Sequence, residues 1–330
     1  MFGLVSRSSL TFEIKEKFET VKESEHTARK KKLWCESIER SIKESYPSSR
    51  LILAGSSVTG FATEGCDVDL TLIRPNRTSL YASTCDVEVL RKIRDGLRSI
   101  RSINTELIDG AVVPILKLTD RIERLEGDIS VDIHNSIFNT YLQKCYANMD
   151  PRVIPLVVNV KHWAKMAGIT GARDHMLSGF AVVLLVIYYL QIGCTPPVLP
   201  SLQAINPSHF NTSSSAVVTA DKLTSGSLPL FVTTYRSNNN ETLGNLLVGF
   251  FKFYCDFNWH QVLSVRLAGP RSVPYDRKWT RPYIRIEDPC DLKNVTRAVY
   301  KSYQFDSIRQ AIRRAKGKLE YDGCRLSEIL

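Results

Sequence analysis

Two acidic residues follow a Gly-Ser turn near the start of the chain. Asp67 and Asp69 lie in an apolar run, so both carboxylates should leave the same face of a predicted strand, because side chains alternate along a strand. Gly55 and Ser56 follow another apolar run and offer a tight turn with N–H groups and a hydroxyl, which suits phosphate oxygens. Adjacent carboxylates repel each other unless a cation lies between them, and Mg²⁺ accepts such a pair together with substrate phosphates. The pattern indicates nucleotidyl or phosphoryl transfer.

A third carboxylate, Asp132, follows in a strand-like run over 129–133. Three acidic side chains from neighbouring strands can hold two metal ions about 3.5–4 Å apart and clamp the attacking and leaving oxygens. The sequence therefore predicts Asp67, Asp69 and Asp132 as catalytic residues and as ligands of Mg²⁺ or Mn²⁺. Asp132 can also be read as an ordinary strand-edge residue. Asp128 lies four residues earlier and on the same predicted face, so it is the next candidate.

The composition is that of a protein with an ample hydrophobic core. The chain has 330 residues, of which 43% are hydrophobic and 24% charged, enough for one large domain or two ordinary ones. The longest apolar run, 180–190, is too short to span a bilayer, and no secretory leader is visible, which predicts no membrane segment. The eight cysteines include no CxxC pair, and reduced thiols in the cytosol or nucleus are expected.

The net charge of +10 is unevenly distributed. The last 69 residues hold 15 basic and 8 acidic residues. Lysine and arginine side chains that neutralise phosphates release counterions, so this bias predicts a polyanionic partner. The alternative for the basic run over 313–318 is the solvated end of a helix.

Hydrophobic periodicity predicts an α+β fold: a mixed sheet followed by a mainly helical domain. One or two helices are expected over 11–47 and a charged helix over 86–103. The predicted strands are 51–54, 67–73, 105–109, 112–119 and 129–133. The later predicted helices are 151–168, 177–192, 241–257, 291–302 and 304–316. Residues 206–240 are rich in Ser, Thr, Asn and Gly and read as a flexible insertion.

Five later motifs, together with the Gly-Ser and Asp-x-Asp region, carry a resemblance to a known family. They are Val160–Lys165, Leu177–Ala181, Val186–Gln191, Leu243–Phe251 and Ile286–Pro289. In this order they resemble the nucleotidyltransferases of the DNA polymerase β superfamily, in the branch of cytoplasmic poly(A) polymerases and terminal uridylyltransferases, and within it the GLD-2 type. The resemblance covers most of residues 50–300.

This resemblance implies a domain arrangement. Residues 1–48 would be N-terminal helices that pack on the central domain, and residues 49–145 would form the nucleotidyltransferase domain. Residues 146–330 would form the helical, poly(A)-polymerase-associated domain, with the insertion near 206–240. The active site would lie in the cleft between the two domains.

The resemblance also implies nucleotide contacts. Gly55 and Ser56 would contact the β- and γ-phosphates, and Lys161 and Lys165, one helical turn apart, the triphosphate. Ser178 would combine helix capping with phosphate binding, and Phe180 would stack on the base where relatives carry tyrosine. The positions that would contact ribose and base are Asn135, Asn139 and Thr140.

The choice of base depends on the segment 286–297. Uridylyltransferases of this type carry a histidine just before the Asn-Val pair, whereas here Lys293 precedes Asn294. A pocket without that histidine has more room for a purine, so ATP is predicted over UTP. Asp288 would accept a hydrogen bond from the adenine amino group, and Arg297 would assist with phosphate or base contacts.

The implied activity is template-independent addition of AMP from ATP to RNA 3′ ends in the cytoplasm. No RNA-reading module is visible in the sequence, so an RNA-binding partner protein is expected to dock on the helical domain, with a monomeric catalytic core inside a heterodimer. The alternatives are a terminal uridylyltransferase that uses UTP and a non-catalytic scaffold of the same fold that binds RNA or protein.

Overall fold

The computed structural model describes residues 2–74, 82–110, 113–171, 174–321 and 324–330. It divides into two compact units, each drawn from separate parts of the chain. We call residues 22–144 and 212–228 the sheet unit, and residues 1–21, 145–211 and 229–330 the helical unit.

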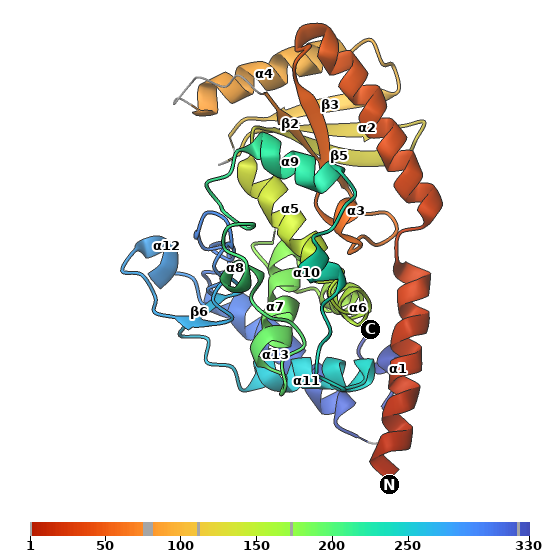
Figure 1. Cartoon of the computed structure of the whole chain (residues 1–330), viewed down its shortest axis with the longest axis vertical. Coiled ribbons are helices and arrows are strands. Elements are labelled where there is room, and N and C mark those ends of the chain that lie inside the picture. The colour runs from red at the N-terminus through yellow and green to blue at the C-terminus, as the bar shows by residue number, and fades with distance from the viewer. Residues whose placement is uncertain (1, 75–81, 111–112, 172–173, 322–323) are drawn as a thin grey trace. The chain divides into compact units, whose positions relative to one another are not determined.

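The sheet unit is built on five strands. They are β1 (Arg50–Ala54), β2 (Val68–Ile73), β3 (Ile103–Ile108), β4 (Ile115–Asp120) and β5 (Leu125–Val131). Their order is β1-β2-β5-β4-β3 (Figure 1). Strands β2 and β5 run parallel, and the other neighbouring pairs run antiparallel. This mixed sheet confirms the predicted α+β class.

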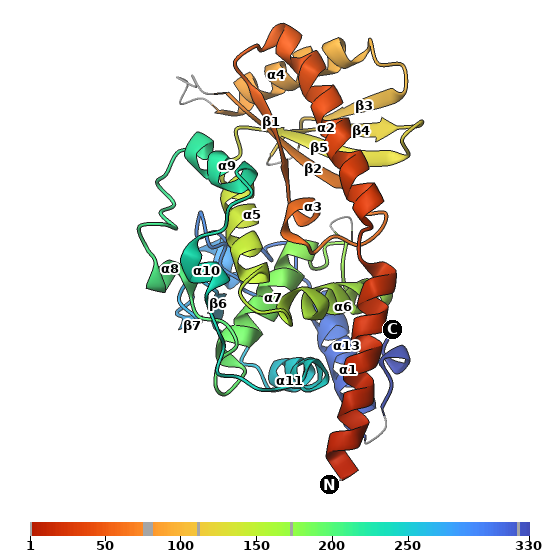
Figure 2. The same ribbon diagram turned by 45° about the vertical axis from the view of Figure 1, so that its right-hand side comes forward.

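Two helices cover one face of this sheet, α2 (Glu25–Ser45) and α4 (Ala82–Leu97) (Figure 2). Helix α2 begins after Ser24, whose side chain accepts a hydrogen bond from the Thr27 amide. Its apolar residues recur at helical spacing, and they join alternate strand residues and the inner side of α4 in one hydrophobic core. On the opposite face, β2 carries Asp69 and Thr71, and β5 carries Glu126, Asp128 and Ser130.

Three more helices belong wholly or largely to the sheet unit: α3 (Ser56–Thr59), α5 (His134–Ala147) and α9 (Ala216–Thr224). Helix α9 lies in the segment predicted as a flexible insertion. Arg50 forms an ion pair with Asp221 at 2.5 Å, and Lys144 Nζ donates to the carbonyl of Leu223 at 3.1 Å. The segment 206–240 therefore contributes a helix to the sheet unit.

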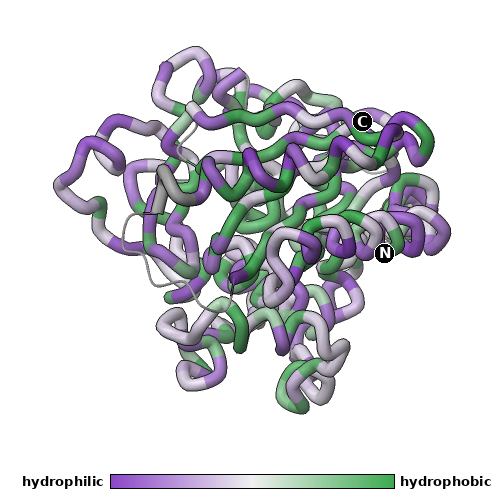
Figure 3. Tube along the Cα trace, turned by 90° about the horizontal axis from the view of Figure 1, so that it is seen from above, coloured by the Kyte–Doolittle hydropathy of each residue, from purple (hydrophilic) through white to green (hydrophobic). Residues whose placement is uncertain are grey.

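The helical unit contains five longer helices: α1 (Phe2–Val21), α6 (Val153–Met166), α7 (Gly179–Ile192), α11 (Leu243–Cys255) and α13 (Ser302–Leu319). Its shorter elements are α8 (Leu202–Ile205), α10 (Leu230–Thr233), β6 (Val262–Ser264), β7 (Gly269–Arg271), α12 (Arg277–Thr280) and the 3₁₀ helix η1 (Leu326–Glu328). Residues 181–191 of α7 are all buried, as expected for a helix that is hydrophobic on every side. Along much of the chain, hydrophobic and hydrophilic residues alternate (Figure 3). None of the helices among the described residues has the length and apolarity needed to cross a membrane.

Two predictions about the helices differ from the structure. Only α1 of the N-terminal pair belongs to the helical unit, where the Gly244 amide donates to Thr11 Oγ1 at 2.9 Å; α2 belongs to the sheet unit. No helix forms over 291–302, because Asn294 ties that segment into an irregular loop through its Oδ1 atom, which accepts from the amides of Ile286 and Thr296.

Candidate active site

Two carboxylates face each other across the parallel strands of the sheet unit. Asp69 on β2 is the register partner of Asp128 on β5. Val68 and Leu70 point into the core beneath α2 and α4, and so does Ile129 on β5. Because side chains alternate, Asp69 and Asp128 both lie on the opposite, polar face. The hydroxyls of Thr71 and Ser130, one step further along this face, lie 3.2 Å apart, which supports the same assignment.

Asp132 does not belong to this pair, so the predicted trio needs a correction. Strand β5 ends at Val131, and Asp132 has a positive φ of 50°. Its carboxylate accepts from the backbone N–H and from Nε of Arg74, both at 2.8 Å. Arg74 follows the last residue of β2, whereas Asp69 is near its start, and the four residues from Asp128 to Asp132 correspond to roughly 13 Å along a strand. Asp128, the second candidate from sequence, takes the place predicted for Asp132.

The polar face concentrates negative charge at Asp128. Burial raises the pKa of Asp128, and the nearby carboxylates of Asp67 and Glu126 raise it further, while Lys117 acts in the opposite direction. Lys117 is the register partner of Asp128 on β4 and lies 3.6 Å from Glu126. Asp67 is two residues before Asp69, so alternation along the chain favours the same side for its carboxylate. A cation bound between these carboxylates would offset their repulsion.

The Gly-Ser turn lies directly against Asp69. Gly55 follows Ala54, the register partner of Asp69, and has φ 64°. A side chain at position 55 would place its Cβ 2.0 Å from Asp69 Oδ2. Only glycine therefore fits here, for its backbone conformation and for its close approach to the carboxylate. Ser56, the first residue of α3, follows at once, and its hydroxyl lies 3.6 Å from Cys66 Sγ.

The three positions predicted for ribose and base contacts lie on α5. Thr140 is buried, and its hydroxyl accepts from the Gly55 amide at 2.9 Å and donates to the Ser136 carbonyl at 2.6 Å. Thr140 thus fixes the turn, and the Gly55 amide is already used in that bond. Asn139 is buried one residue earlier, and Asn135 is half-buried in the first turn.

A buried lysine holds the loop that precedes Asp67. Lys31 on α2 lies 2.5 Å from a carboxylate oxygen of Glu23 and donates to the Cys66 carbonyl at 2.7 Å. Burial by itself lowers the pKa of Lys31, but the bonds with Glu23 and Cys66 outweigh it, and the pKa is raised above its ordinary value. Sequence periodicity gave no sign of this role, because Lys31 sits within a run of three lysines.

We expect Lys31→Met to lower the free energy of unfolding by about 3–5 kcal/mol, because it leaves the Glu23 carboxylate buried without its cation. Urea denaturation measures this loss. The double variant Lys31→Met/Glu23→Gln removes both charges and should recover part of it. A single variant as stable as the wild type would contradict the buried ion pair.

His134 opens α5, and burial lowers its pKa. A histidine with a lowered pKa supplies stability above its ordinary pKa of about 6.5, and that stability is lost as the pH falls through the folded-state value. We expect His134→Asn to lose less stability than the wild type between pH 7.5 and 5.5 in urea denaturation. If the variant and the wild type lost the same stability over this pH range, His134 would not contribute to the pH dependence of stability.

The helical unit holds the predicted triphosphate residues on two of its helices. Lys161 and Lys165 lie one turn apart on α6, and Lys165 is exposed. Lys161 Cε lies 3.8 Å from the position of a Cβ at Gly179, the first residue of α7. This places Lys161 against the N-terminus of α7, where main-chain N–H groups favour anions.

Ser178 and Phe180 also lie at this end of α7. Ser178 is exposed, and its hydroxyl accepts from the Ala181 amide at 3.1 Å, which is the capping geometry predicted for it. Phe180 is half-buried, so part of its ring remains accessible. The structure thus brings Lys161, Ser178 and Phe180 to one region of the helical unit.

The segment predicted for base recognition is anchored by a buried glutamate. Glu287 accepts from Ser264 Oγ at 2.7 Å and from Nε of Arg266 at 3.0 Å, and it also pairs with Arg271. Asp288, the next residue, accepts through Oδ1 from the Cys290 amide at 2.8 Å, so it shapes the turn. Arg297 is exposed further along the segment.

The residues on the polar face of the sheet fit a hard divalent cation in their chemistry. In the described ranges no group of three or more Asp, Glu, His or Cys side chains is already arranged to hold a metal ion. Mg²⁺ seldom needs such a cage, since it is commonly held by one or two carboxylates together with substrate phosphates and water. The two aligned carboxylates, Asp69 and Asp128, with Asp67 nearby, meet that requirement.

Comparison with known proteins gives matches along most of the chain. Residues 10–148 match the family model of the central palm domain of mitochondrial-like poly(A) RNA polymerases, and residues 242–294 match that of the Cid1 family of poly(A) polymerases. The mouse poly(A) RNA polymerase GLD2 is 35% identical over 311 residues, which cover 92% of this chain and 63% of the mouse protein. The human GLD2 is 34% identical with the same coverage. The chain thus spans about 63% of the length of these curated relatives.

Solved structures show the same fold. A GLD-2/RNP-8 complex superimposes with a TM-score of 0.84 at 27% identity and covers 98% of both chains. The Cid1 poly(U) polymerase superimposes with a TM-score of 0.77 at 26% identity and covers 96% of this chain and 95% of its own.

In sequence and in fold, the chain is thus similar to poly(A) polymerases and to the Cid1 poly(U) polymerase. Its similarity extends over 92% of the chain to the curated GLD2 poly(A) RNA polymerases and over 98% to the chain solved in the GLD-2/RNP-8 complex. The resemblance inferred from the sequence motifs is confirmed.

Proposed function

We propose that this protein is a template-independent RNA adenylyltransferase that transfers AMP from ATP to RNA 3′ ends. The observation that carries the proposal is the register pairing of Asp69 and Asp128 beside the Gly55 turn. The GLD2 relatives, which are named poly(A) RNA polymerases, support both the nucleotide and the acceptor.

The acidic face supplies the reaction centre in this proposal. Asp67, Asp69 and Asp128 would hold Mg²⁺ or Mn²⁺, which when bound neutralises the triphosphate and activates the attacking 3′-hydroxyl. Structures of the Cid1 relative are described as bound to MgGTP and to Mg 3′-dATP, which supports a divalent ion with a nucleotide. Asp128 would share the ion with Asp69, since the two residues are register partners on neighbouring strands.

The remaining assignments concern substrate binding. The Ser56 hydroxyl would donate to the β- and γ-phosphates, while Gly55 and Thr140 hold the turn. On the helical unit, Lys161 and Lys165 would neutralise the triphosphate, Ser178 would bind phosphate at the start of α7, and Phe180 would stack on the base. Asn135 and Asn139 would contact the ribose and base.

The preference for ATP rests on the loop that follows Glu287. Lys293, rather than a histidine, directly precedes Asn294. The Lys293 side chain is exposed and pairs with Asp291 at 2.7 Å. A Cid1 variant in which asparagine replaces a histidine is described as bound to MgATP in work on UTP selectivity, which supports a role of such a histidine in excluding ATP. Asp288 and Arg297 would complete the contacts to the base.

Primer extension with each nucleoside triphosphate, Mg²⁺ and a short labelled RNA tests the proposal. We expect ATP to be incorporated at least tenfold faster than UTP, which corresponds to about 1.4 kcal/mol of discrimination. Asp69→Ala should abolish extension while the circular dichroism spectrum is unchanged. Faster use of UTP would identify a uridylyltransferase, and no extension with any nucleotide would favour a non-catalytic scaffold.

We further propose that the protein acts in the cytoplasm with an RNA-binding partner docked on the helical unit, the catalytic subunit being monomeric within that heterodimer. The relative solved as a GLD-2/RNP-8 complex supports a partner protein. Extension by this chain alone at physiological salt should be distributive, adding few nucleotides per binding event. Long tails made without a partner would contradict this part of the proposal.

A further inference from the structure

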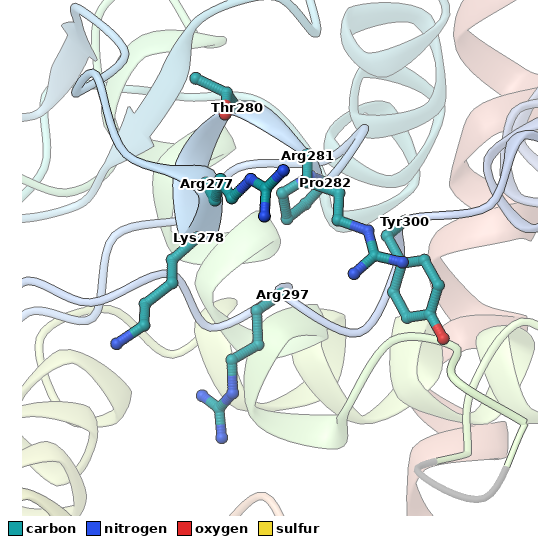
Figure 4. A pocket seen from close by; sticks show the side chains of 7 residues that line it. All are labelled: Arg277, Lys278, Thr280, Arg281, Pro282, Arg297 and Tyr300. Carbon is teal, nitrogen blue, oxygen red and sulfur yellow. The ribbon is translucent and has the colours of Figure 1, made fainter.

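A second basic site lies in the helical unit, beside the base-recognition segment. A cavity of about 610 Å³ is lined by Arg277 and Lys278 from α12, by Arg281 just after it, and by Arg297 and Tyr300. Figure 4 shows the charged ends of the four basic side chains arranged around one open space. No acidic residue is among those that line it.

The four cations of this cavity are not used to hold the fold together. Among the described residues, Arg277, Lys278, Arg281 and Arg297 form no ion pair and are all exposed. Their neighbours behave differently, since Arg266 and Arg271 are both paired with the buried Glu287. Like charges gathered in one cavity repel each other, so an anion bound there would be favoured.

Hydrogen bonds and a buried tryptophan hold the backbone of α12, which carries two of these cations. Trp279 is buried, and its carbonyl accepts from Nε of Arg285 at 2.6 Å. The carbonyl of Lys278 accepts from the side-chain amide of Asn294 at 3.2 Å, which ties α12 to the base-recognition segment. The cations are therefore presented from a rigid support, which lowers the ordering cost of binding.

One cation already lies on an aromatic ring. The Arg281 guanidinium lies over Tyr300, 4.2 Å from the ring centroid, so its other face is available for stacking. Stacking on arginine planes combined with phosphate contacts is how proteins commonly hold single-stranded nucleic acid. A single phosphate group would not use the stacking surface of Arg281, so these features favour a nucleic acid strand.

We propose that this cavity binds the phosphodiester backbone of single-stranded RNA, with Arg277, Lys278 and Arg281 as the phosphate contacts. The site deepens the proposed function, on which it rests, because it would hold the acceptor RNA. The same cations could instead meet the triphosphate of the nucleotide, and the experiment below separates these two sources.

The test is fluorescence anisotropy with a labelled 15-nucleotide RNA, without ATP or Mg²⁺. The protein carries Asp69→Ala throughout, so that binding is measured apart from catalysis. In this background, Arg277→Ala/Lys278→Ala/Arg281→Ala should weaken binding at least tenfold. It should also reduce the slope of log Kd against log salt by about two, the value for three contacts to a single strand. A matched control, Lys15→Ala/Lys252→Ala/Arg314→Ala, removes three exposed cations elsewhere on the helical unit and should change Kd less than twofold.

An unchanged RNA affinity, or an equal loss in the control variant, would overturn the proposal. A second measurement, made with Asp69 restored, compares the KM for ATP, which the triple variant should leave within twofold. A raised KM with unaltered RNA binding would assign the cavity to the triphosphate and also overturn it. If the wild-type chain binds RNA through this cavity but extends it with no nucleotide, the proposed function fails while the RNA site stands.

Discussion

Asp128→Asn is expected to reduce kcat for AMP transfer about 10³-fold or more. The carboxylate lies in register with Asp69, and in the proposed reaction its loss would remove a metal ligand from the acidic face. Metal ligation supplies several kcal/mol of transition-state stabilisation, and about 4 kcal/mol corresponds to a thousandfold in rate. Single-turnover extension with saturating ATP, Mg²⁺ and RNA measures this effect. The substitution removes charge repulsion from a half-buried site, so the variant should remain folded.

The matched control is Asp132→Asn. Asp132 bonds to Arg74, which also pairs with Asp86 at 3.1 Å, and this network ties the end of β2 to the end of β5. Its disruption should lower the free energy of unfolding by about 1–3 kcal/mol. The kcat of the variant should stay within about threefold of the wild type below its melting temperature. A loss of 10³-fold in Asp132→Asn with normal activity in Asp128→Asn would reverse the assignment.

Glu287→Ala is expected to lower the free energy of unfolding by about 3–5 kcal/mol, because it leaves Arg266 and Arg271 without their buried counter-ion. Glu287 is 1% exposed, and it joins β6 to the base-recognition segment through its side chain and through its amide, which donates to the Leu263 carbonyl at 2.9 Å. Thermal and urea denaturation measure the loss. The variant should also bind nucleotide more weakly, because the segment that carries Asp288 is no longer anchored by the Glu287 side chain.

Lys293→Ala provides the comparison within the same loop. The Lys293–Asp291 pair is solvent-exposed, and such pairs are worth about 1 kcal/mol or less. The free energy of unfolding of this variant should therefore be within about 1 kcal/mol of the wild-type value. If both variants lost the same stability, the buried network around Glu287 would not be the anchor of the segment.

The carboxylate site shows how far sequence patterns reach. Asp67 and Asp69 were predicted from alternation within one strand, a local property. Asp69 lies on β2 as predicted, whereas Asp67 immediately precedes the strand, which begins at Val68. The third carboxylate depends on which residues of β5 pair with β2, which is set by packing across the sheet. The predicted strand began at 129, whereas β5 starts at Leu125 and ends at Val131, so Asp132 falls past its end. Asp132 instead accepts a hydrogen bond from Arg74, a residue 58 positions away in the sequence.

Long-range contacts also account for the other differences. The bond from the Gly55 amide to the Thr140 hydroxyl, which joins residues 85 positions apart, had no signal in the sequence pattern. The basic bias of the last 69 residues was visible as composition, yet composition did not indicate that four of those cations line one cavity. The buried helix α7, by contrast, was predicted over 177–192 and forms over Gly179–Ile192, because a run of apolar residues on all sides determines its own burial.

The most direct measurement is the position of Mn²⁺ in crystals grown with a non-hydrolysable ATP analogue, read from its anomalous scattering. We expect an ion on the polar face of the sheet, with carboxylate oxygens of Asp69 and Asp128 at coordination distances of about 2 Å. Asp132 should remain bonded to Arg74 in the same crystals. An ion held by Asp132 with Arg74 displaced, or a nucleotide bound with its ion away from Asp128, would contradict this assignment.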